Sequence, residues 1–448
     1  MSNIDQKDTL SRRSLLKTAT VGSGLLVAAS PFVGRSSAKA QFATPTVLKG
    51  QTINGLFATD SPLDDQMLQD EATRFEAATG IKFKYQTAGA DLFDKVATLV
   101  AAQSTEFDIY HTHYAQIGRY SGGFQPLNDF AARDGVTADK FIKSSFDALT
   151  VNNALLAIPM RVDIRSFYWR TDLFQKAGLT EPPKTRDEFL KAAKATNDPP
   201  GVYGFATVGK GDPALREFSD LLWENGGDFL EGGLQPSKPI FNQDAGVEAL
   251  QYWYDLIYTD KVTFPGTAGY QWNDLTGLFE SGQAVMSKQW NPGPFEDPAQ
   301  SAIVGKYGIT AIPAGPKSKR TTAVCHARAI NSFSAHKDAA WEFIKFEASE
   351  DNWLKREALL GEKPSLISAL QKVTDRATGL RKANLDAALA HLNAGDGYTW
   401  PLFTEFNQIQ PIIWGEIEAV LSNQKKPKEA LDFAASEATK ILQQAKLI

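Results

Sequence analysis

Alternation of strand-like and helix-like segments constrains the fold of this chain more than any other feature. Residues 52–57 read as a strand, and residues 67–78 carry apolar side chains at helical spacing. Residues 81–85 alternate apolar with charged side chains, as a half-buried strand does. A second helical pattern over 92–100 leads to a strand at 107–110. These repeated strand–helix–strand units predict an α/β fold with a parallel sheet covered by helices on both faces.

The ends of the predicted strands are candidate ligand positions. Ligands of open α/β sheets bind in the crevice outside the carboxyl ends of the strands. The pattern therefore places binding residues in two loops: one around Asp60, after the first strand, and one at His111–Tyr114, after the third.

A second α/β block begins near residue 162. Residues 167–169 read as a strand and residues 172–177 as a short helix. Thr185 and Glu188 form a capping box, in which the hydroxyl and the carboxylate satisfy free amides at the start of a helix. We expect further elements at 247–257 (helix), 284–286 (strand) and from Pro427 onward (helix).

The first forty residues have the pattern of an export signal. Arg12 and Arg13 precede an apolar stretch over 18–33, and Ala38–Ala40 forms a small-x-small cleavage site. The arginine pair resembles the twin-arginine signal. A membrane anchor is the alternative, but the stretch is short and contains glycine and proline. We therefore predict a twin-arginine signal peptide over 1–40 and a periplasmic mature protein.

Composition excludes several classes of function. A chain of 448 residues with 43% apolar residues is long enough for two or three domains. Its formal charge of -5, with no basic block beyond the N-terminus, argues against a nucleic-acid partner. The single cysteine, Cys325, excludes an internal disulfide and a zinc site built from cysteines.

Several stretches match the signatures of a known family in the same order along the chain. They are 155–159 (Leu-Leu-Ala-Ile-Pro), 167–174 (Phe-Tyr-Trp-Arg-Thr-Asp-Leu-Phe), 177–179 with 182–185, 279–286 (Phe-Glu-Ser-Gly-Gln-Ala-Val-Met) followed by Trp290, 307–316, and 339–346. This set resembles the extracellular solute-binding proteins of family 1. These are carbohydrate-type receptors of ABC importers, similar to maltodextrin-binding and glycerol-phosphate-binding proteins.

The resemblance implies the type II periplasmic-binding-protein fold, with two α/β lobes joined by hinge crossings and a ligand cleft between them. Lobe one would hold residues 41–161 and 327–363, and lobe two residues 162–326 and 364–448. Closure of the hinge is biased only by a ligand that contacts both lobes. The implied partners are a sugar or polyol and the ABC permease, which would provide the only contact with the inner membrane. We expect a monomer without a cofactor.

The resemblance also nominates residues of the cleft. Asp163 matches an acidic residue that binds sugar hydroxyls, and Trp290 matches an aromatic that stacks on a sugar. The other nominated residues are Asp60, His113, Tyr114, Arg165, Trp272, Arg328 and Trp400. Trp272 and Trp400 are weaker candidates, because a tryptophan in such a protein more often packs in the core than lines a site. Arg161 and Arg165 are also compatible with structural ion pairs to Asp163.

The chemistry of the ligand stays open between two alternatives. Aromatic faces and carboxylates favour a neutral sugar or polyol. Arginines near the cleft favour a phosphate or carboxylate on the ligand, and the sequence His326-Ala327-Arg328 stands where the family usually has a glycine pair.

An exported carbohydrate-active or cofactor enzyme is the rival class of protein. The chain has no G-x-x-x-x-G-K-[ST], H-E-x-x-H, G-x-S-x-G or C-x-x-C motif. His111 and His113 could supply two metal ligands, but the spacing indicates no third. We therefore predict a binding protein.

Overall fold

The computed structural model describes residues 46–58, 62–89, 92–401 and 403–448. The described residues all belong to one compact unit. The predicted signal peptide at 1–40 and the predicted site residue Asp60 lie outside the described residues. Within the described ranges, no helix is long and apolar enough to cross a membrane.

The elements follow the alternation expected from the sequence. The strands are β1 Thr52–Ala58, β2 Lys82–Ala88, β3 Ile109–His113, β4 Thr150–Val151, β5 Ala154–Leu155, β6 Ile158–Ile164, β7 Ser166–Arg170, β8 Tyr203–Ala206, β9 Ala284–Gln289, β10 Tyr307–Thr310, β11 Thr321–Ile330 and β12 Gly397–Tyr398. The α-helices are α1 Pro62–Thr79, α2 Leu92–Ala101, α3 Tyr114–Ile117, α4 Asn128–Arg133, α5 Lys143–Asp147, α6 Thr171–Lys176, α7 Arg186–Thr196, α8 Asp212–Glu224, α9 Asp244–Tyr258, α10 Trp272–Glu280, α11 Lys337–Glu347, α12 Glu350–Leu360, α13 Ile367–Arg376, α14 Gly379–Asn393, α15 Phe406–Leu421 and α16 Pro427–Gln444. The predicted helices and strands are confirmed in type and order.

One sheet is built on the N-terminal strands. Its order is β12-β11-β3-β1-β2, and β6 also pairs with β11. Strand β1 is parallel to β2 and β3, which confirms the predicted strand–helix–strand units. Strand β11 is antiparallel to β3 and to β6, so the complete sheet is mixed.

A second sheet has the order β10-β7-β9-β8. Strands β8 and β9 are parallel, whereas β7 is antiparallel to both β9 and β10. Apolar clusters cover both faces: one contains Phe189 of α7 and Leu256 of α9, and the other contains Leu275 and Phe279 of α10. The chain thus forms two sheets that pack against helices, which matches the predicted α/β class.

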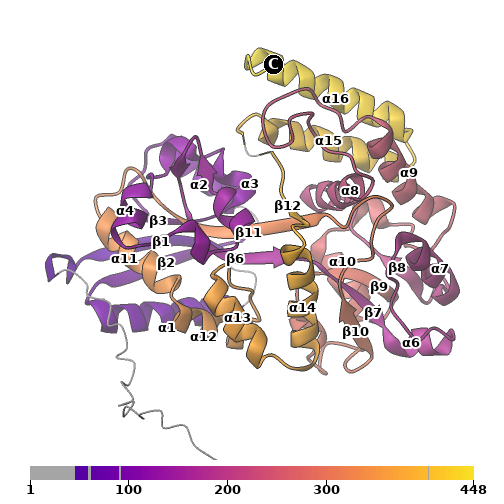
Figure 1. The fold of residues 1–448 in the computed structure, drawn as a ribbon, viewed down its shortest axis with the longest axis horizontal. Coiled ribbons are helices and arrows are strands. Elements are labelled where there is room, and N and C mark those ends of the chain that lie inside the picture. The colour runs from indigo at the N-terminus through magenta and orange to yellow at the C-terminus, as the bar shows by residue number, and fades with distance from the viewer. Residues whose placement is uncertain (1–45, 59–61, 90–91, 402) are drawn as a thin grey trace, which may run out of the picture. The chain divides into compact units, whose positions relative to one another are not determined.

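Two long strands connect the regions of these sheets. In Figure 1, β6 and β11 run from the elements around β1–β3 to those around β7–β9. Only Arg165 separates β6 from β7. The segment after α12 joins them, since Val162 N donates to Lys363 O (2.9 Å) and Ser365 N donates to Met160 O (2.7 Å). Three chain segments therefore pass side by side.

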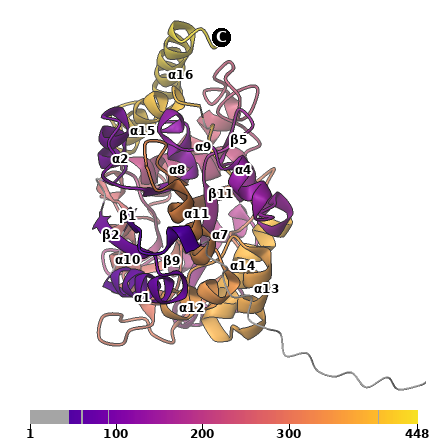
Figure 2. The same ribbon diagram turned by 90° about the vertical axis from the view of Figure 1, so that its left-hand side faces the viewer.

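The C-terminal helices pack on the helices of the middle of the chain. Helices α15 and α16 lie side by side in both views (Figures 1 and 2). The hydroxyls of Tyr254 and Tyr258, on α9, donate to Asn423 Oδ1 (2.9 Å) and Leu421 O (2.8 Å), at the end of α15. The predicted amphipathic helix from Pro427 is α16, with its apolar stripe buried.

The predicted boundary of strand β3 was wrong. The pattern placed a strand at 107–110 and a loop at His111–Tyr114, but β3 continues to His113 and Tyr114 begins α3. The strand is longer because of tertiary structure. Strand β11 pairs antiparallel with β3 and aligns His326 with His113 and Arg328 with His111. The strand therefore extends through polar residues.

The N-terminus of α7 shows the predicted cap with one change. Thr185 Oγ1 accepts from Glu188 N (3.3 Å), as expected. The Glu188 carboxylate, however, accepts from Lys184 N (2.7 Å) rather than from the amide of Thr185. The Glu188 carboxylate thus accepts from the amide of the residue that precedes the predicted capping box.

Replacing Thr185 with alanine is expected to lower the free energy of unfolding by about 1 kcal/mol, because one helix amide loses its acceptor. The matched control is Thr378→Ala, since Thr378 precedes α14 without a side-chain cap. Urea unfolding measures both variants. Equal losses in the two variants would contradict the assigned cap.

Candidate functional site

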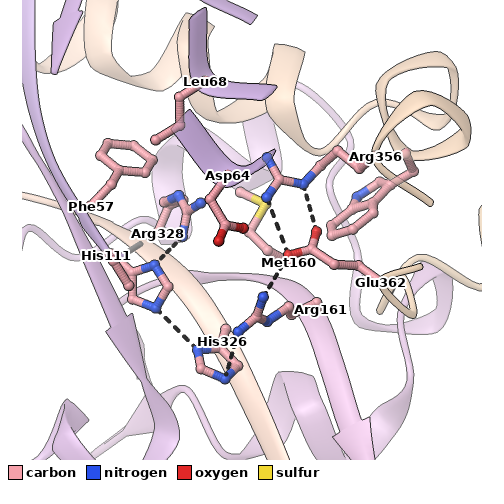
Figure 3. A pocket seen from close by; sticks show the side chains of 12 residues that line it. Phe57, Asp64, Leu68, His111, Met160, Arg161, His326, Arg328, Arg356 and Glu362 are labelled. Atoms are coloured by element: carbon pink, nitrogen blue, oxygen red, sulfur yellow. Dashed lines mark hydrogen bonds and ion pairs between the residues drawn. The ribbon is translucent and has the colours of Figure 1, made fainter. Parts of the chain in front are cut away.

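A pocket lies beside the end of β1 (Figure 3). It is contributed by segments that are far apart in the sequence, among them β1, α1, β3, β6, β11 and α12. The lining residues are Phe57, Ala58, Asp64, Leu68, His111, Met160, Arg161, His326, Arg328, Trp353, Arg356 and Glu362. The position beside β1 and β3 agrees with the binding edge expected for an α/β sheet.

Two of the pocket's three arginines are held by buried carboxylates. Arg328 donates from Nε and Nη2 to Glu347 (2.9 and 2.6 Å) and lies over the ring of Phe57 (4.3 Å). Arg356 donates from Nη1 to Glu71 (2.8 Å), whose side chain is fully buried. Each cation therefore has an anion at contact distance within the wall.

The third arginine, Arg161, shares a carboxylate with Arg356. Glu362 accepts from Arg161 Nη1 (2.5 Å) and from Arg356 Nε (2.8 Å). Burial alone would raise the pKa of Glu362, but Arg356 and Arg161 lower this pKa to about 2. Glu362 is thus a permanent anion between two guanidinium groups (Figure 3).

A chain of hydrogen bonds crosses the floor of the pocket. Arg328 Nη1 lies 2.9 Å from His111 Nδ1, and His111 Nε2 lies 3.0 Å from His326 Nδ1. His326 Nε2 in turn lies 3.3 Å from Asp163 Oδ2. Because Arg328 can only donate, the chain assigns the proton of neutral His111 to Nε2 and that of His326 to its own Nε2. Asp163 accepts at the end of this chain.

The electrostatic states of this chain follow from burial and neighbouring charge. Burial, reinforced by Arg328, lowers the pKa of His111 well below its ordinary value of 6.5. Burial would raise the pKa of Asp163, but Arg161, 3.1 Å from its carboxylate, and the hydrogen bond from His326 hold that pKa below its usual range. The chain therefore runs between a neutral imidazole and an ionised carboxylate.

The predicted aromatic Trp290 lies in a neighbouring cluster with Trp272 and Arg165. The two indole rings meet edge to face with centroids 5.5 Å apart. The guanidinium of Arg165 lies 5.6 Å from the ring of Trp272 and 5.8 Å from that of Trp290. Lys363, next to Glu362 of the pocket, donates from Nζ to Trp290 O (2.9 Å).

Arg165 is fixed from behind by helix α8. It donates to Glu217 (2.8 Å) and forms an ion pair with Asp220, and all three side chains are buried. Asp220 also accepts from Thr322 N (2.7 Å), at the start of β11. The structure therefore answers the open question about Arg165: its ion pairs are with α8 and not with Asp163.

Two other nominated residues, Tyr114 and Trp400, lie together in a third, buried cluster. Both side chains are 0% exposed, so Trp400 packs in the core. The guanidinium of Arg216 lies 4.5 Å from the ring of Trp400 and donates to the hydroxyl of Tyr114 (3.2 Å). His113, the neighbour of Tyr114, has its ring centroid 5.9 Å from that of His326.

The sequence nominated residues around the pocket more often than residues of its lining. Arg328 lines the pocket, and Asp163 contacts the lining residues Arg161 and His326. Arg356 and Glu362 were not predicted as site residues. Both follow β11 by many residues on α12 or just after it, and no local motif marks them.

His111 and His113 both make hydrogen bonds within the protein. His113 Nδ1 accepts from Ala115 N (3.2 Å), and His111 is hydrogen-bonded through both ring nitrogens. In the part of the chain that the structure describes, no group of three or more His, Cys, Asp or Glu side chains is placed to hold a metal ion.

Comparison with known proteins assigns the family. The model of the bacterial extracellular solute-binding protein family matches residues 58–352. The chain belongs to this family, and it is a substrate-binding protein of an ABC importer. The predicted family and the two-lobed fold are thereby confirmed.

Individual relatives are similar over nearly the whole chain. A probable amino-acid ABC transporter periplasmic-binding protein, y4oP, of Sinorhizobium fredii is 25% identical over 93% of this chain and 95% of its own length. The maltose-bound T. maritima MalE3 structure has a TM-score of 0.77 at 25% identity, covering 87% of this chain and 100% of the other. A ribitol complex of a solute-binding protein from Agrobacterium radiobacter K84 has a TM-score of 0.76 at 26% identity, covering 88% and 99%.

Proposed function

We propose that this protein captures a neutral sugar or polyol in the pocket of Figure 3 and delivers it to its permease. The observation that carries the proposal is the charge balance of the pocket. Its three arginines are paired with Glu71, Glu347 and Glu362, and Asp163 adds a further anion. A dense set of donors and acceptors without surplus positive charge suits hydroxyl groups.

The same balance disfavours the phosphorylated or acidic ligand that the arginines alone would favour. A phosphate would have to compete with carboxylates already bound to each guanidinium at 2.5–2.9 Å. It would also approach Asp163 and Glu362, both ionised. Repulsion between the negative phosphate and these two carboxylates would oppose binding.

The tryptophan pair supplies the apolar half of the proposed recognition. Trp290 is half-buried and is joined to the pocket's edge through Lys363. The faces of Trp290 and Trp272 can stack on the C–H surface of a sugar ring. The ligands named for the two similar structures, maltose and ribitol, are neutral.

Capture would proceed by hinge closure between the proposed lobes, 41–161 with 327–363 and 162–326 with 364–448. Strands β6 and β11 and the segment around Lys363 run side by side and would form the hinge. A ligand that contacts the arginine pocket and the tryptophan pair would favour the closed state, because it binds that state better.

The remaining parts of the proposal concern the setting of the protein. It would be exported through the twin-arginine pathway to the periplasm, act as a monomer and require no cofactor. It would release its ligand chemically unchanged, which separates it from an exported enzyme.

A thermal-shift screen tests this function. The mature chain, residues 41–448, is heated with a panel of neutral sugars, polyols, their phosphates and amino acids. A neutral sugar at a hundred times its Kd should add about 2.7 kcal/mol of stability. Shifts confined to phosphates or to amino acids would contradict the proposed ligand class, and consumption of a ligand would indicate an enzyme.

Replacing Trp290 with alanine is expected to weaken binding of the neutral ligand at least tenfold, about 1.4 kcal/mol, because a stacking surface is lost. Trp290→Phe should retain most of the affinity. The matched control is Trp414→Ala, which removes another half-buried tryptophan, on α15. Calorimetric titration measures all three, and unchanged affinity in Trp290→Ala would exclude Trp290 from the site.

A further inference from the structure

A second pocket lies beside the second sheet. It shares no lining residue with the pocket of Figure 3. Helices α7, α8 and α9 and strands β7, β8 and β9 contribute to its wall. It is therefore separate from the sugar site proposed above.

Aromatic side chains form a large part of the wall of this second pocket. Phe167, Phe189, Phe205 and Trp253 all line it and are at most 7% exposed. Rings of Phe167 and Phe189 and of Phe189 and Phe205 meet edge to face, at 6.0 and 4.9 Å. Such a wall favours a flat aromatic guest, because ring edges and faces pack well against one another.

The charged groups of the wall are balanced in pairs. Arg186 donates to Glu224 (2.6 Å), and Lys288 forms an ion pair with Glu217. Arg186 also donates to Asn225 Oδ1 (2.7 Å). A charged guest would have to break these pairs, so the pocket favours a neutral one.

Three hydrogen-bond donors of the wall remain to be satisfied. Arg186 Nε, the Tyr252 hydroxyl and Trp253 Nε1 are buried, and no acceptor for them is found among the described residues. The guanidinium of Arg186 lies 4.6 Å from the ring of Tyr252, so two of these donors belong to side chains in contact. Buried donors without partners are rare in folded proteins and call for an acceptor from outside the chain.

We propose that this pocket is a second small-molecule site, which takes a neutral, single-ring aromatic compound carrying a carbonyl oxygen. The aromatic wall receives the ring. The carbonyl oxygen, which can accept two hydrogen bonds, takes them from the contacting side chains of Arg186 and Tyr252. A site for this class of ligand goes beyond the capture of a sugar.

Ligand-observed NMR titration of the mature chain with acetophenone tests the site, and ethylbenzene is the probe that lacks the oxygen. Acetophenone is expected to bind saturably and at least ten times more tightly than ethylbenzene. Tyr252→Phe should reduce that preference severalfold while leaving ethylbenzene binding unchanged. Absence of saturation, or equal affinity for the two probes, would overturn the proposal and leave ordered water as the partner of the donors.

A matched pair of filling variants locates the binding. Ile312 lines the pocket, whereas Ile309, equally buried, belongs to the apolar cluster on the other face of the sheet. Ile312→Phe is expected to abolish acetophenone binding, and Ile309→Phe to preserve it. Circular dichroism first shows that each variant is folded, and Tyr252→Phe replaces Ile312→Phe if the latter is not. Acetophenone binding unaffected by Ile312→Phe would place the probe elsewhere. Because sugar binding is measured separately, failure here leaves the proposed function standing.

Discussion

Replacement of Asp220 by alanine is expected to destabilise the protein by about 3–5 kcal/mol, the cost of breaking a buried ion pair. Asp220 is 0% exposed and forms an ion pair with Arg165, which is also 0% exposed. It accepts from Thr322 N (2.7 Å), Thr322 Oγ1 (2.8 Å) and Thr321 Oγ1 (3.2 Å). The variant would leave a buried cation and three donors with too few acceptors.

The position of Asp220 explains why the effect is expected to be large. Asp220, on helix α8, contacts both Arg165, at the junction of β6 and β7, and the start of β11, whereas Glu217 of the same helix contacts Arg165. Burial would raise the pKa of Asp220, but Arg165 and Lys288 lower it, so the group is ionised at neutral pH. One side chain thus joins both connecting strands to the same helix.

Urea unfolding at pH 7.5 measures the loss, and Asp147→Ala is the control. Asp147 pairs with Lys143 at 2.5 Å, but its side chain is 55% exposed. An exposed pair of this kind contributes at most about 1 kcal/mol. A loss below about 1 kcal/mol in Asp220→Ala would show that the buried network contributes little to stability.

Lowering the pH from 7.5 to 5 is expected to reduce the free energy of unfolding through His111 and His113, by at most about 4 kcal/mol. Burial is the main cause that lowers the pKa of both far below 6.5; Arg328 adds to the effect at His111, and His326 and Arg216 add to it at His113. The unfolded chain takes up protons on both residues below about pH 6.5, whereas the folded chain does not. Each histidine therefore costs about 1.4 kcal/mol per pH unit below that value and nothing above it.

The double variant His111→Gln, His113→Asn isolates this effect. Asparagine at position 113 can still accept from Ala115 N, as His113 does. Glutamine at position 111 can still accept from Arg328. Unfolding free energies of wild type and variant at pH 7.5 and pH 5 are compared. The wild type should lose more than the variant, by at most about 4 kcal/mol, and equal losses would show that the two histidines are not held neutral.

Much of the fold could be predicted because it is encoded locally. The apolar alternation at 81–85 and the helical spacing at 67–78 each specify their element, and β2 and α1 follow. The end of β3 could not be predicted in this way. His111 and His113 are polar, and they continue the strand only because β11, distant in sequence, supplies the hydrogen bonds.

Only those residues of the candidate site that lie on or near the family signatures could be predicted from the sequence. Arg328 and Asp163 lie on β11 and β6, which the family signatures mark, and both belong to the pocket or its edge. Arg356 and Glu362 arrive from α12 and the turn after it. Their ion pairs depend on tertiary contacts that sequence spacing does not reveal.

The charge balance of the pocket could not be derived from sequence either. Arg328 alone favoured an acidic ligand, and only the buried position of Glu347, 2.6 Å from it, reverses that inference. Glu347 ends helix α11 and looks like an ordinary helix-terminal residue in the sequence. Pairing of buried charges is thus the feature that separates the two ligand classes.

The most direct test of the account is calorimetric titration of the mature chain with the neutral sugar or polyol that gives the largest thermal shift. Its phosphate ester is titrated in parallel, and mass spectrometry analyses the recovered ligand. We expect one site per chain, recovery of the ligand unchanged, and binding of the ester at least ten times weaker than binding of the neutral ligand. Tighter binding of the ester, or a chemically altered ligand, would contradict the account.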